Sequence, residues 1–185
     1  MAQSLYIAQG NGITFTPNTS ASLYYIAVNT ATASQVTTGS LSNYYVSASA
    51  LSQSDYGKRS VYIPLNTYVP LNGTETNVVR IPSPLNGWKL ISAMASCSAS
   101  STSGSPTFTI YRSSASSITQ VNMLSTNVTI DQGEYDSLYA SASTVVSSSN
   151  VVYTGDKVWV SSAGSALCGT GVLYSGVSLT FQNLF

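Results

Sequence analysis

The stretch Gly176-Val177-Ser178-Leu179-Thr180-Phe181-Gln182 decides the fold class. Apolar and polar side chains alternate along it, so Val177, Leu179 and Phe181 share one side of an extended chain. This alternation is typical of a strand with one buried face. The same pattern recurs in four other runs, namely Trp88 to Cys97, Thr107 to Tyr111, Leu124 to Ile130 and Val151 to Val160.

The composition also favours strands. Ser, Thr, Val and Tyr dominate, Glu occurs only at positions 75 and 134, and no window has helical spacing of apolar residues. Only 6% of residues are charged, against roughly 25% in an ordinary soluble domain. An uncharged surface suits a subunit fixed in an assembly better than a freely diffusing monomer.

Two regions are expected within this all-β chain. Residues 85–185 carry regular period-two runs separated by Gly, Ser and Asn turns, which predicts a jelly-roll β-sandwich. Residues 1–84 are irregular and predict an extended, strand-containing arm, in which Pro-Leu-Asn begins at positions 64 and 70 and again at 84. Strand-like runs in this arm are Leu5 to Ala8, Leu23 to Val28, Asn43 to Ser47 and Ser60 to Ile63.

The alternation also predicts a core. The side chains expected to be buried are Ile91, Phe108, Ile110, Val128, Ile130, Val158, Val160, Val177, Leu179 and Phe181.

No catalytic, cofactor-binding or metal-binding residue is predicted, and the chain is not expected to be an enzyme. It has no histidine, which removes His-based bases and metal ligands. Cys97 and Cys168 lack the spacing of a zinc or redox motif, and Gly10-Asn11-Gly12 lacks the third glycine of a phosphate loop. Without a secretory signal after Met1, the two cysteines are expected to be reduced and buried.

Three clustered acids, Asp131, Glu134 and Asp136, were the best candidates for chemistry. They could form a glycosidase pair or a weak calcium site. We favour a solvated loop whose acids support a turn. Asp156, after Gly155, is likewise interpreted as a turn residue.

The thirteen tyrosines remain open between strand packing and a role at an interface or in sugar stacking. The six basic residues are scattered, which argues against a nucleic-acid partner. No apolar run reaches the roughly 20 residues that cross a bilayer, so no membrane partner is expected.

The runs Trp88 to Ile91, Phe108 to Arg112, Met123 to Asp131, Thr154 to Val160 and Gly176 to Phe181 together resemble a small jelly-roll module. Such modules occur in head-surface, spike and tail-fibre proteins of tailed bacteriophages, often as trimers. The resemblance covers about the last 100 residues. The family pattern has many charged residues between the strands, and this chain has mostly Ser and Tyr there.

This resemblance implies a structural virion protein that is assembled in the host cytoplasm. The expected role is that of a capsid decoration (cement) protein, a homotrimer whose partner is the major capsid protein. The alternative is a tail-fibre protein that recognises host surface glycans. An enzyme such as a depolymerase has little support in the sequence.

Overall fold

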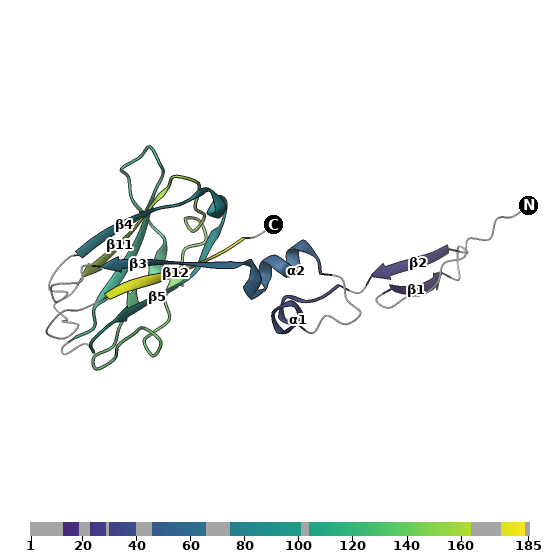
Figure 1. The fold of residues 1–185 in the computed structure, drawn as a ribbon, viewed down its shortest axis with the longest axis horizontal. Coiled ribbons are helices and arrows are strands. Elements are labelled where there is room, and N and C mark those ends of the chain that lie inside the picture. Colours follow the sequence, from purple (N-terminus) through teal and green to yellow (C-terminus); the bar gives the residue numbers. More distant parts are fainter. Residues whose placement is uncertain are drawn as a thin grey trace, which may run out of the picture. The chain divides into compact units, whose positions relative to one another are not determined.

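A computed structural model describes residues 13–18, 23–28, 30–39, 46–65, 75–100, 104–163 and 175–183. The chain divides into two compact units, Met1–Gly57 with Leu184–Phe185, and Lys58–Asn183 (Figure 1). The expected boundary at 84/85 therefore lies inside the second unit and is wrong. Two segments assigned to the arm are strands of the second unit, β3 (Lys58–Leu65) and β4 (Glu75–Arg80).

The second unit is a sandwich of two antiparallel sheets. The smaller sheet has the order β3-β12-β5, and the larger has the order β4-β11-β6-β7, with β9 also paired to β6. Strands β8 and β10 pair antiparallel in a separate two-stranded sheet. The remaining bounds are β5 Lys89–Cys97, β6 Thr107–Ser113, β7 Val121–Asn122, β8 Leu124–Thr126, β9 Val128–Thr129, β10 Thr144–Val145, β11 Lys157–Ala163 and β12 Ser175–Gln182.

One apolar core lies between the two sheets. Val177, Leu179 and Phe181 face it from β12, and Phe108 and Ile110 face it from β6. All the side chains expected in the core are buried except one. The all-β prediction is thus confirmed, and the alternation argument assigned the faces of β6, β11 and β12 correctly.

Ile91 is the exception, and a β-bulge explains it. Thr180 pairs with Ser92, but the next residue, Phe181, pairs with Leu90, so Ile91 is skipped in the ladder. One extra residue reverses the alternation on either side of it. Leu90 therefore points into the core, while Ile91 is only half-buried.

Pro64 explains why part of the predicted arm belongs to the sandwich. Proline predicts an extended linker, yet Pro64 lies in β3, which is an edge strand of the smaller sheet. An edge strand tolerates a residue without an N–H donor. The Pro64 carbonyl also accepts a hydrogen bond of 2.6 Å from the Asn77 side chain on β4.

The first unit contains a hairpin and two short helices. Strands β1 (Ile13–Asn18) and β2 (Leu23–Val28) pair antiparallel, and the predicted strand over Leu23–Val28 is confirmed. The helices α1 (Ala33–Thr38) and α2 (Ala48–Gln53) are not predicted by the sequence, in which no window has helical spacing of apolar residues. A short 3-10 turn, η1 (Asp55–Gly57), follows them.

Local capping explains the two helices. Thr32 and Gln35 form a reciprocal capping box at the start of α1, and Gly39 ends it with φ 72°. Ser47 caps α2 by accepting a hydrogen bond from the Ala50 amide. The predicted strand from Asn43 to Ser47 is therefore wrong at Val46 and Ser47, and its first three residues lie outside the described residues. The predicted strand from Leu5 to Ala8 also lies outside them.

Two glycines with positive φ mark turns of the second unit. Pro84 and Leu85 belong to the short helix η2 (Ser83–Leu85), and Gly87 in the turn that follows has φ 79°. Gly155 has φ 83° in the turn before β11. A side chain at either glycine would strain this left-handed backbone.

Candidate functional site

The three clustered acids do not form a metal site. Glu134 and Asp131 close a backbone turn, and the Asp136 carboxylate accepts a hydrogen bond of 2.8 Å from the Leu138 amide. Across residues 104–163 and the other described ranges, no group of three or more His, Cys, Asp or Glu residues is close enough to hold a metal ion. The turn interpretation of Asp136 agrees with this geometry.

Asp156 also supports a turn, and it has a second role. Its carboxylate accepts a hydrogen bond of 3.0 Å from the Tyr153 amide and lies 3.6 Å from the Arg112 guanidinium. The Asp156 side chain is nearly fully buried, and Arg112 donates a further hydrogen bond to the Val151 carbonyl. This ion pair connects β6 to the turn before β11. The hydrogen bonds that its two side chains make go to the backbone of that turn and of Val151, so the pair has a structural role.

Cys97 is disulfide-bonded, so the expectation of two reduced thiols is wrong for this residue. It ends β5 and faces the core. Cys168, the other cysteine of the sequence, lies outside the described residues.

A hollow of about 240 Å³ opens at the edge of β5 that lies away from β12. At the end of β5, the Cys97 and Ala95 amides donate to the Tyr135 carbonyl and the Ser137 hydroxyl. At its start, the Leu90 amide donates to the Asn150 carbonyl. Between these anchors the chain from 137 to 143 bows away from the edge, which creates the hollow beside Ser92–Met94.

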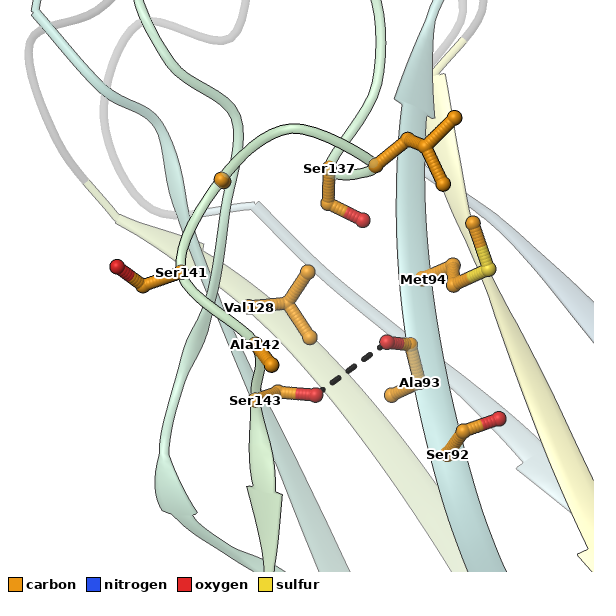
Figure 2. A pocket seen from close by; sticks show the side chains of 10 residues that line it. Ser92, Ala93, Met94, Val128, Ser137, Ser141, Ala142 and Ser143 are labelled. Atoms are coloured by element: carbon orange, nitrogen blue, oxygen red, sulfur yellow. Dashed lines mark hydrogen bonds between the residues drawn. The ribbon is translucent and has the colours of Figure 1, made fainter.

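The residues that line the hollow are uncharged and mostly Ser or Ala, with Met94, Val128 and Leu138 as the larger side chains. Figure 2 shows the Ser143 hydroxyl directed at β5, where it donates a hydrogen bond of 3.4 Å to the Ala93 carbonyl, and Ser137 directed into the space from the loop. The Ser141 hydroxyl points away from β5. Since no acid, base or thiol lines it, the hollow suits an uncharged group and offers no nucleophile–base pair.

The outer face of the smaller sheet continues from this hollow. Tyr62 on β3, Ser178 on β12 and Met94 on β5 pair side by side in one row. The Tyr62 ring leans diagonally onto Gly176, because a Cβ placed there would lie only 2.3 Å from the Tyr62 hydroxyl oxygen. Tyr62 is nevertheless 52% exposed, so one ring face is covered by the sheet and the other faces solvent.

The outer face of the larger sheet carries a different row. Val78 on β4, Trp159 on β11 and Tyr111 on β6 are directly opposite one another. Val78 is 41% exposed and the two aromatic side chains are half-buried. The Trp159 indole donates a hydrogen bond of 3.2 Å to the Ser113 hydroxyl, which fixes the ring on the sheet.

Both rows were missed from the sequence. Alternation with the buried Val158 and Val160 places Trp159 on the outer side of its strand, but its neighbours across the sheet depend on pairing with distant segments. Gly176 was the one available signal for Tyr62, since a glycine inside a strand often marks the close approach of another group. Of the two adjacent tyrosine pairs in the sequence, Tyr24 and Tyr25 lie in β2 of the first unit, and Tyr44 and Tyr45 lie outside the described residues.

A search against known protein families finds no family model that matches the chain, and no curated protein matches it either. Among the helices of the described segments, none has the length and apolar character needed to traverse a bilayer.

Proposed function

We propose that this chain is a non-enzymatic structural protein of a tailed-bacteriophage particle, and that it decorates the outer surface of the head. The observation that carries the proposal is the row Val78–Trp159–Tyr111 on an outer sheet face. Trp and Tyr, with Arg, are the residues that dominate binding energy at protein interfaces. Arg80 lies beside the row, opposite Lys157.

The strand order supports a jelly roll, which is the module expected for such a protein. The first strand of the sandwich, β3, pairs with the last, β12, and the second, β4, pairs with the second to last, β11. Inside these pairs, β6 pairs with β7, and β5 makes bridges at Ser96–Asp136 and Lys89–Val151. This nested pairing is that of a long hairpin rolled into two sheets.

The low charge supports a fixed position in an assembly. Docking through Trp159 and its neighbours buries mostly apolar atoms, so affinity for heads should fall only slightly as salt rises. We propose that the partner is the major capsid protein and that the chain acts as a homotrimer. Neither a nucleic acid nor a membrane is proposed as a partner.

Imaging of phage particles with a label on this protein tests the location. Many copies distributed over the head support decoration. A few copies at one vertex or on the tail favour the alternative, a tail-fibre protein that recognises host glycans; the hydroxyl-rich face around Tyr62 favours that role. Particles that lack the protein altogether would overturn both.

Substitution of Trp159 by Ala tests the docking face. Loss of a central interface Trp costs about 2 kcal/mol or more, which corresponds to roughly a 30-fold weaker head affinity. Tyr62→Ala is the matched control, because it removes an aromatic ring from the opposite outer face. If both variants bind heads as the unchanged protein does, the larger sheet is not the docking face.

A further inference from the structure

We propose that the outer face of the smaller sheet, together with the hollow at the edge of β5, binds an uncharged oligosaccharide. The site consists of the Tyr62 ring, the adjacent hydroxyl row Ser60, Thr180 and Ser92, the Met94 side chain and the hollow. It goes beyond the proposed head docking and does not depend on it, because docking is assigned to the opposite face.

The Tyr62 ring is the stacking element. Gly176 has no side chain, and the ring occupies the space where one would be, with a Cβ placed at Gly176 lying 2.4 Å from Tyr62 Cζ. The ring is thereby held against the sheet with its other face open. A pyranose presents C–H groups from one side of its ring, and these carry the partial positive charge that the negative face of an aromatic ring attracts.

Hydroxyl groups surround this ring. Ser60 on β3, Thr180 on β12 and Ser92 on β5 form the row next to Tyr62, and the Ser60 and Thr180 oxygens lie 3.3 Å apart. Ser178 lies within the row of Tyr62 itself. A hydroxyl both donates and accepts hydrogen bonds, as the hydroxyls of a sugar do, so such a row can pair with either.

The charge of the face selects the class of ligand. The two rows that contain Tyr62 and Ser60 hold no charged residue, and Lys58 and Lys89 appear only in the row at the end of the strands. A phosphorylated or nucleic-acid ligand would find few cations here. A protein partner would meet mainly hydroxyls, where interface centres are usually apolar. An uncharged saccharide needs no cations and binds through hydroxyl groups, so it fits both the low charge and the many hydroxyls of this face.

The hollow extends the site across the sheet. Ser92 and Met94 belong to the outer face and also line the hollow. Its volume of about 240 Å³ is below the ~300–1,000 Å³ of pockets for drug-sized ligands, which suits a single sugar ring. Because β3 and β5 are two strand spacings apart, roughly 10 Å, one extended oligosaccharide can contact both the Tyr62 ring and the hollow.

The test uses the full chain on an array of bacterial surface polysaccharides, with maltohexaose and cellohexaose as defined neutral probes. Binding to at least one uncharged saccharide is expected. For that saccharide, Tyr62→Ala should weaken binding at least tenfold, whereas Tyr62→Phe, which keeps the ring, should change it less than threefold. Trp159→Ala, on the opposite face, should leave it unchanged.

A second variant moves the ring without removing it. Gly176→Ala introduces a Cβ that pushes the end of the Tyr62 side chain off the sheet, so it should weaken saccharide binding as Tyr62→Ala does. Thermal melting checks that each variant folds. The proposal is overturned if no array saccharide binds, if only charged ones bind, or if binding survives Tyr62→Ala. If the protein binds saccharide but does not dock on heads, the proposed function is overturned and this proposal stands.

Discussion

Each of the two units of the chain is stabilised internally by a different kind of interaction. In the sandwich, apolar side chains from both sheets form one continuous core that includes Phe108, Leu179 and Phe181. In residues 30–39 and 46–57 of the first unit, the buried apolar cluster consists of Ala31, Val36 and Ala50. Stability rises with the apolar surface buried, so the sandwich can fold alone, whereas the helices of the first unit depend on their caps. The following predictions test this difference.

The largest effect is expected from where the chain is cut. Removal of residues 1–57 should leave a sandwich that melts cooperatively, because every strand of both sheets remains. Removal of residues 1–84 should abolish the fold, since it deletes β3 and β4 together with the buried Ile63 and Leu65. Circular dichroism of the two fragments measures this. A shorter fragment that melts like the longer one would restore the boundary at 84/85.

The second effect lies within the sandwich core. Phe181→Ala should lower the free energy of unfolding by about 3–5 kcal/mol, because the side chain is fully buried and leaves a cavity. Ile91→Ala is the control on the neighbouring strand. At the bulge this side chain is only half-buried, so its loss should cost clearly less. Equal costs in denaturant titrations would mean that Ile91 faces the core after all.

These two variants also show how far the sequence predicts the fold. Alternation identified the buried faces of β6, β11 and β12 because the predicted core residues of each strand follow one another at a spacing of two and all of them are buried. It failed at Ile91 because a bulge is a property of two paired strands. It also missed α1 and α2, which are too short for a helical period and are specified instead by caps such as Thr32 and Ser47.

The candidate site was less accessible to prediction for the same reason. Tyr62 and Gly176 come together only through the pairing of β3 with β12, and Trp159 meets Val78 and Tyr111 only through two further pairings. Residue types alone leave the tyrosines open between strand packing and a role at an interface or in sugar stacking. Which ones lie on a common surface depends on register, which the sequence does not display.

A smaller effect is expected at the buried ion pair of the sandwich. Asp156→Asn keeps an acceptor for the Tyr153 amide but leaves the charge of Arg112 without its partner. Asp156 is nearly fully buried and Arg112 partly exposed, so the cost should be about 2 kcal/mol, between exposed and fully buried pairs. Asp131→Asn, at an exposed turn, is the control and should change stability by less than about 0.5 kcal/mol. If Asp156→Asn leaves the free energy of unfolding unchanged in denaturant titrations, the ion pair contributes nothing to stability.

The smallest effect is expected at the capping box of the first unit. Thr32→Ala removes the acceptor for the Gln35 amide, which should destabilise α1 by about 1 kcal/mol. Hydrogen exchange of the α1 amides should accelerate severalfold, while the melting temperature of the sandwich stays constant because its core lies in a separate unit. Ser34→Ala, inside the same helix, should not accelerate exchange, since Ala favours the helix. A fall in the sandwich melting temperature with Thr32→Ala would show that the small unit stabilises the large one. The two units would then not be independent in stability.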